Sequence, residues 1–135
     1  MIIVDTTVII DIWRGNEKVK KILKKFRNED LHISMITIAE LYDGLGYTKK
    51  IKNISFYEKI KNQIDVILSE FYILPITETI IREAGLLRGE LRANGLVIDI
   101  IDCIIGASVK ILNAKGIITR NSRHFSNFKI PIYAY

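Results

Sequence analysis

Acidic side chains occur at places in this sequence where the local pattern predicts the end of a strand or the start of a helix. Asp5 follows an apolar run at residues 1–4, and Asp99 and Asp102 open an apolar segment that continues to Asn113. Two acids three positions apart share one face if the first turn is helical. Carboxylates that meet in a partly buried cleft repel one another unless a cation neutralises them, and Mg²⁺ or Mn²⁺ suits a set of oxygen ligands without His or Cys.

The same acids have a simpler structural interpretation. An aspartate at the start of a helix accepts backbone N–H bonds and faces the positive end of the helix dipole, so Asp5, Asp99 and Asp102 could each be a cap. Glu40 lies on a polar stripe of a predicted helix over residues 35–46, and such a stripe normally faces water. Taken singly, none of these residues identifies a site.

The elements that would position these acids follow from hydrophobic spacing. Apolar runs predict five short strands, and helical periodicity predicts helices between them. The alternation predicts an α/β fold with a mostly parallel sheet covered on both faces, and ligands then bind beyond the carboxyl ends of the strands. Asp5 and Asn121 each follow such an end. The predicted strands are residues 1–4, 31–34, 72–76, 117–119 and 130–135, and the main helices are 6–13, 16–30, 35–46, 56–71, 77–94 and 102–113.

Two further segments are predicted to be loops, and one glycine is predicted to end a helix. The lysine-rich stretch 47–55 lacks clean apolar periodicity and is predicted to be a loop with a basic surface. Residues 122–128 read as a polar and aromatic loop. Gly116 is predicted to end the apolar helix, since glycine favours that position.

Composition limits the class of protein. The chain has 135 residues, 49% of them hydrophobic, which fits a single domain over residues 1–135 with its own core. The net charge of +5 indicates a polyanionic partner such as nucleic acid, and the lysines of segment 16–30, Arg14 and Arg120 are candidates for contacting its phosphates. The single cysteine, Cys103, excludes an internal disulfide and favours a reducing, cytoplasmic location. No apolar run reaches the roughly 18 residues of a membrane span, and residues 1–13 do not resemble a signal peptide.

Three segments together resemble the PIN domain family, and within it the VapC-type toxin ribonucleases. They are IIVDTTVII near the N-terminus, SMITIAELYDG in the middle, and DIIDCIIGASVKILNAKGIITRNSRHF near the end. The order, the spacing and the total length agree over essentially the whole chain. The resemblance implies a three-layer sandwich with a short, mostly parallel central sheet flanked by helices. It also implies a toxin that hydrolyses RNA and leaves a 5′-phosphate and a 3′-hydroxyl, forms a homodimer and is silenced by a small protein antitoxin.

The resemblance also assigns site residues. The family's metal-binding acids fall on Asp5, Glu40 and Asp102, which would hold Mg²⁺ or Mn²⁺, and its helix turns Glu40 inward. Thr7, Asp99 and Asn121 would support that shell. The chain departs from the family pattern in three places: Thr7 replaces an asparagine or serine, Asn121 stands where many members have a fourth acid, and His124 stands where an aspartate is frequent.

Other functions remain open on the sequence alone. A PIN fold that binds RNA or protein without cutting is the main alternative, because Asn121 can offer only a neutral oxygen. A metal-independent ribonuclease would use His32 and His124 as base and acid, although their spacing does not indicate a pair. A receiver domain would need an acidic pair and a late lysine, and a haloacid-dehalogenase-like phosphatase would need Asp-x-Asp; the segments DTT and IITRN have neither.

Overall fold

The centre of the molecule is one sheet of five short strands. In the computed structural model, which describes residues 1–135, the strand order is β3-β2-β1-β4-β5 and every pair is parallel. Val4 of the central strand lies between Ile33 and Ile118, so the carboxyl ends of β1, β2 and β4 are level. The strands are β1 (Ile2–Val4), β2 (Leu31–Ser34), β3 (Tyr72–Leu74), β4 (Ile117–Thr119) and β5 (Ile132–Ala134).

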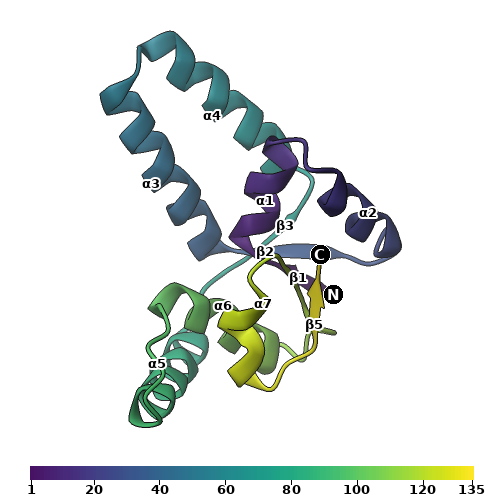
Figure 1. Ribbon diagram of the computed structural model, residues 1–135, viewed down its shortest axis with the longest axis vertical. Helices are drawn as coiled ribbons and strands as arrows, with labels where there is room; N and C mark the ends of the chain where they lie inside the picture. Colours follow the sequence, from purple (N-terminus) through teal and green to yellow (C-terminus); the bar gives the residue numbers. More distant parts are fainter.

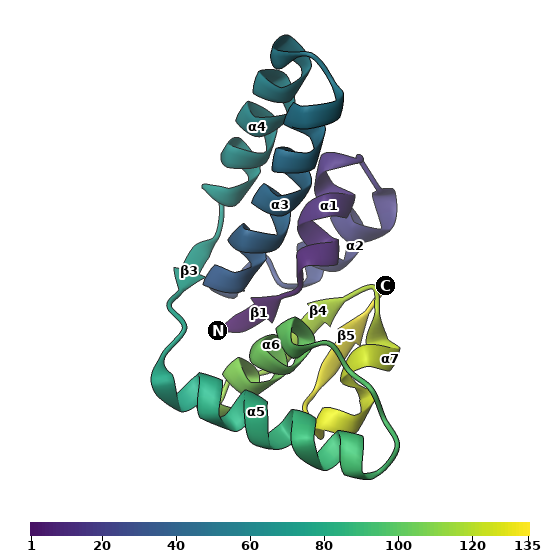
Figure 2. The same ribbon diagram turned by 90° about the vertical axis from the view of Figure 1, so that its left-hand side faces the viewer.

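Helices cover both faces of this sheet and give three layers (Figures 1 and 2). Side chains alternate along a strand, so Ile3 packs into one core while Ile2 and Val4 pack into the other. The first core is covered by α5 (Glu78–Ala93), α6 (Ile100–Ile111), α7 (Ser122–Phe125) and the 3₁₀ helix η1 (Ser126–Phe128). The second is covered by α1 (Thr6–Trp13), α2 (Glu17–Lys25), α3 (Met35–Ile51) and α4 (Ile54–Leu68). The predicted three-layer α/β sandwich is confirmed.

Side-chain caps start several helices, including α4, whose cap Asn53 lies inside the stretch predicted to be a loop. Asn16, Asn53 and Thr77 each accept a hydrogen bond from a backbone N–H in the first turn of the following helix. In α2 the inward residues Val19 and Ile22 are buried and the lysines point outward, as its amphipathic spacing predicts.

The prediction of a loop over residues 47–55 is wrong. Helix α3 continues to Ile51 and α4 begins at Ile54, so only Lys52 and Asn53 separate them. The two helices form an antiparallel hairpin that projects from the sheet (Figures 1 and 2). Its end buries little, and the apolar periodicity that reveals a helix is therefore absent there.

Two further local predictions need correction. Gly116 does not end α6: the helix closes at Leu112, and Asn113 takes the left-handed conformation with φ of 48°. Gly116 instead leads into β4, where an added Cβ would lie 2.7 Å from the carbonyl oxygen of Pro131. Residues 122–128 form α7 and η1 rather than a loop, because Phe125 and Phe128 are buried there and pack edge to face.

None of the helices is both long enough and apolar enough to cross a lipid bilayer.

Candidate active site

A polar hollow of about 290 Å³ lies beyond the carboxyl ends of the central strands. Its walls come from four parts of the chain: the β1–α1 junction, α3, the start of α6 and the segment after β4. Every residue predicted as a metal ligand or as part of the supporting shell lines it. The lining residues are Asp5, Thr6, Thr7, Ile10, Glu40, Asp99, Ile101, Asp102, Asn121 and His124.

Asp5 occupies the junction between β1 and α1 and is only 4% exposed. Although it stands at the N-cap position of α1, its side chain makes no capping hydrogen bond. Its Oδ2 instead accepts hydrogen bonds from the hydroxyls of Thr7 (2.6 Å) and Thr119 (2.7 Å). The capping interpretation is therefore wrong for the Asp5 side chain, which two hydroxyls orient at the edge of the hollow.

Glu40 reaches the hollow from the first half of α3. It is half-buried, and the Thr6 hydroxyl donates a hydrogen bond to its Oε2 at 2.5 Å. Burial raises the pKa of Glu40, and repulsion from Asp5 and Asp102 raises it further against the opposing effect of the Thr6 bond. The helix pattern alone places this residue in open solvent, and that expectation is wrong; the inward orientation implied by the family resemblance is the observed one.

Asp102 and Asp99 have different roles at the start of α6. Asp99 caps the helix, since its Oδ1 accepts a hydrogen bond from the Ile101 backbone N–H at 2.8 Å. Oδ2 of Asp102 lies 2.8 Å from Nδ1 of His124. Burial raises the pKa of Asp102 and outweighs the hydrogen bond from His124. The capping interpretation is thus confirmed for Asp99, whereas the Asp102 side chain bonds across the hollow.

The donors around this hollow are carboxylate, hydroxyl and amide oxygens, which match the preference of Mg²⁺ and Mn²⁺. Burial, with added repulsion from neighbouring carboxylates, raises the pKa values of Glu40 and Asp102, and a bound cation would offset both effects. No three Asp, Glu, His or Cys side chains converge tightly enough to form a ready-made coordination group. The types of donor atom fit a hard divalent cation. In this structure, hydroxyl groups and an imidazole form hydrogen bonds with the carboxylates instead.

Of the remaining predicted residues, Asn121 lies in the hollow and the two arginines lie outside it. Asn121 lines the hollow, and its backbone N–H donates to the Thr119 hydroxyl at 2.9 Å. Arg120 lies outside the hollow, and its Nη1 pairs with Asp11 at 2.7 Å. Arg14 is exposed at the end of α1 and has no ion pair. The hollow thus brings the predicted acids together but neither of the predicted arginines.

Sequence reasoning missed two residues that hold the acids of this site. The hydroxyls of Thr6 and Thr119 hold Glu40 and Asp5, while buried Asp11 holds Arg120 outside the hollow. The only signal for Thr119 was its position at a predicted strand end. His32, the other histidine considered, stacks on Tyr72 at 5.0 Å and does not line the hollow with His124.

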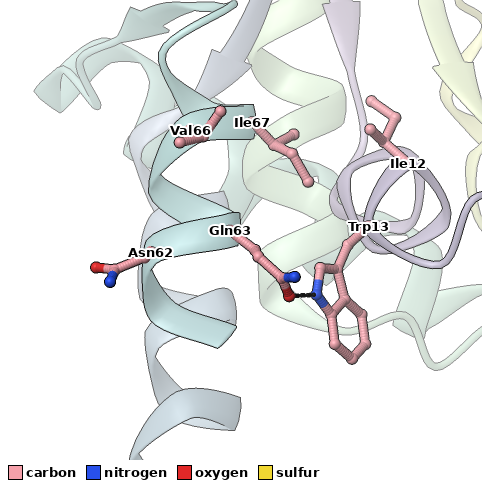
Figure 3. A pocket seen from close by; sticks show the side chains of 6 residues that line it. All are labelled: Ile12, Trp13, Asn62, Gln63, Val66 and Ile67. Carbon is pink, nitrogen blue, oxygen red and sulfur yellow. Dashed lines mark hydrogen bonds between the residues drawn. The ribbon is translucent and has the colours of Figure 1, made fainter. Parts of the chain in front are cut away.

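An apolar surface adjoins the acidic hollow. A second hollow of about 450 Å³ lies between the end of α1 and α4, where Trp13 Nε1 donates to Gln63 Oε1 at 3.0 Å (Figure 3). A third, of about 210 Å³, lies between α1, α3 and α4. It shares Trp13 with the second hollow, and Ile10 and Glu40 with the acidic one. Apolar side chains therefore continue from the acids along α1 and α4.

The model of the PIN domain family matches residues 2–130. No curated protein sequence matches the chain at a significant level.

Similar solved structures cover nearly the whole chain. FitAcB from Neisseria gonorrhoeae has a TM-score of 0.83 at 28% identity, covering 98% of this chain and 96% of its own. VapBC2 from Rickettsia felis, bound to a DNA fragment from its promoter, has a TM-score of 0.82 at 25% identity, covering 100% and 99%. VapBC-1 from nontypeable Haemophilus influenzae has a TM-score of 0.79 at 26% identity, covering 99% and 98%.

Proposed function

The chain belongs to the PIN domain family, whose model matches nearly all of it, and from that premise we propose that it is a metal-dependent endoribonuclease acting as the toxin of a toxin–antitoxin pair. One observation carries the proposal. Carboxylates from three distant parts of the sequence, Asp5, Glu40 and Asp102, face one hollow; burial raises the pKa of Glu40, and repulsion from the other two acids adds to that shift. An uncompensated acidic cluster is unfavourable for a fold and is useful for holding a cation.

Asp5, Glu40 and Asp102 would hold Mg²⁺ or Mn²⁺, with Thr7, Asp99 and Asn121 as the supporting shell. When bound, such an ion supplies positive charge to a phosphodiester and activates water for hydrolysis. The chain's own part is to orient the acids: Thr7 and Thr119 fix Asp5, and Thr6 holds Glu40. A cation would compete with the Thr6 hydroxyl for Glu40 and with His124 for Asp102.

The proposed partners are an RNA substrate, a small protein antitoxin and a second copy of the chain, all in the cytoplasm. Support for the antitoxin comes from the VapBC structures of similar fold. It also comes from the apolar surface along α1 and α4, which adjoins the acids and includes the partly exposed Trp13. A short neighbouring reading frame whose product copurifies with this chain would identify the antitoxin.

The test replaces each acid by its neutral counterpart: Asp5→Asn, Glu40→Gln and Asp102→Asn. Each variant is expected to lose RNA cleavage in Mg²⁺ by more than about 100-fold, since loss of a ligand exceeds the usual cost of losing its supporting partner. Asp43→Asn is the matched control, because Asp43 lies on α3 close to Glu40 but is exposed and unpaired. Cleavage that persists in these three variants, or in wild type with EDTA, would contradict the proposal.

The alternative is a PIN fold that binds RNA or protein without cutting. Two observations favour it: Asn121 is neutral, and the acids do not form a ready-made coordination group. Calorimetric titration with Mn²⁺ beside the cleavage assay separates the two functions. Metal binding together with cleavage supports the enzyme, and RNA binding without either supports the inactive module.

A further inference from the structure

Helix α2 carries a stripe of lysines that lines a hollow of its own. Lys18, Lys21 and Lys25 form one wall of a space of about 180 Å³, and Ala134 and Tyr135 form another. The spacing of three and four residues places these lysines on one side of the helix. None of them has an acidic partner, whereas Lys20 on another side pairs with Glu17 at 2.6 Å. Three uncompensated positive charges therefore surround one concave surface.

A chain of contacts joins this lysine hollow to the acidic hollow. The Tyr135 hydroxyl donates to Asp11 Oδ2 at 2.9 Å, and Arg120 Nη1 donates to Asp11 Oδ1 at 2.7 Å. The Arg120 backbone N–H then donates to the Thr7 hydroxyl at 3.3 Å, and Thr7 lines the acidic hollow. In Figures 1 and 2 the C-terminal end lies beside α2. The positive surface thus begins a few contacts away from the acids.

The acidic hollow and the lysine hollow carry opposite charges, which act in opposite ways on a phosphodiester. The acidic hollow repels a phosphodiester, so the strand must be held by positive charge next to the cleaved bond. Lysines attract phosphates regardless of sequence, and an aromatic ring beside them offers a platform for an unpaired base. Tyr135 is partly exposed in the lysine hollow and suits that contact. A base inside a duplex has both faces covered, so this combination favours a single strand.

We propose that the lysine hollow binds the phosphates of single-stranded RNA that flanks the cleavage site, with Tyr135 beside a base. This inference rests on the proposed ribonuclease function for its substrate. The proposal assigns RNA binding to the lysines of α2. Arg120, another candidate from the sequence, instead forms an ion pair with Asp11.

Binding is measured by fluorescence anisotropy in EDTA, where no metal-dependent cleavage interferes. The RNAs are a labelled single strand of about 15 nucleotides, long enough to leave the acidic hollow, and a trinucleotide. The test variant is Lys18→Gln with Lys21→Gln and Lys25→Gln. The matched control removes three lysines near the far end of the α3–α4 hairpin, Lys50→Gln with Lys52→Gln and Lys59→Gln, which also have no acidic partner.

The α2 variant is expected to bind the longer RNA about 10-fold more weakly at low salt, with a salt slope smaller by roughly 2, since each phosphate contact contributes about 0.7. In the α2 variant, the longer strand is expected to bind little more tightly than the trinucleotide. A triple Lys→Arg variant at the same positions keeps the tighter binding of the longer strand, which shows that positive charge is the cause. Equal losses in the α2 and hairpin variants, or no loss in either, would overturn the proposal. Because this assay involves no cleavage, its result stands whether or not the chain proves to be a nuclease.

Discussion

At the scale of single residues, the site is a set of acids whose charges are held in an unfavourable environment. Burial raises the pKa values of both Glu40 and Asp102, and the neighbouring carboxylates add to the shift. In the metal-free protein, the folded state therefore binds protons at a higher pH than the unfolded chain does. The contribution of these groups to stability falls as pH rises from their ordinary values of 4.5 and 3.8 through the raised values, and stays low above them.

Because the charged form of Glu40 is unfavourable in the folded protein, we predict that Glu40→Gln stabilises the metal-free protein at neutral pH. Glutamine keeps an oxygen that accepts the Thr6 hydrogen bond but carries no charge. In EDTA at neutral pH the Tm is expected to rise by about 2 to 4 °C, and the difference from wild type should disappear at about pH 3, where Glu40 is protonated in both states. Calorimetry at the two pH values provides the measurement, with Asp43→Asn as control. A lower Tm for Glu40→Gln at neutral pH would show that the charge is not a source of strain.

Residue roles were predictable from sequence where they depend on near neighbours. The capping role of Asp99 needs only the residues that follow it, and it is observed. The hydroxyl partners of the acids were not predictable, because Thr6 and Glu40 are 34 positions apart and Thr119 and Asp5 are 114 apart. Only the folded chain brings such pairs together. The inward orientation of Glu40 likewise came from the family resemblance and not from its helix.

At the scale of elements, α6 connects the acidic site to the core. Asp102 lies in its first turn, and Gly106 follows one turn later against the ring of Phe128. An added Cβ at Gly106 would lie 2.1 Å from Phe128 Cδ2, so glycine permits this close packing. The position of the first turn of α6 therefore depends on a contact made by η1.

Gly106→Ala is predicted to destabilise the fold by about 1 to 3 kcal/mol, the usual cost of forcing extra volume into a packed core. Gly85→Ala is the matched control, because Gly85 also lies inside a helix and has open space around it. That change is expected to stabilise α5 by about 0.5 to 1 kcal/mol, since alanine loses less conformational entropy in a helix. Urea unfolding of both variants checks the contrast. Similar effects of the two changes would mean that the Phe128 contact does not restrict α6.

The strands and the amphipathic helices were predictable because their apolar residues recur with the period of the element. The end of the α3–α4 hairpin was not, since few side chains are buried there and its pattern is lysine-rich. Residues 122–128 were also predicted wrongly. Their two phenylalanines mark a buried turn of helix, but a segment this short contains too few residues to show a period.

At the scale of the whole molecule, the acidic hollow joins the two cores of the sandwich. Asp5 and Glu40 come from the layer built by α1 to α4, while Asp102 comes from α6 on the opposite face of the sheet. The parallel strands make this possible, because the ends of β1 and β4 are level at one edge. Helices α3 and α6 already touch directly at this edge, and a cation held by all three acids would add a second link between the two layers.

This arrangement predicts a coupled response to metal. Mn²⁺ is expected to slow amide hydrogen exchange in the first turns of α6 and in the first half of α3 together, because opening either helix would break the same site. The wild-type Tm should rise by several degrees in the same titration. Asp102→Asn, which changes only the α6 side, should lose the protection in both helices, whereas Asp43→Asn should retain it. Protection confined to one helix, or surviving in Asp102→Asn, would mean that the three acids bind no common ion.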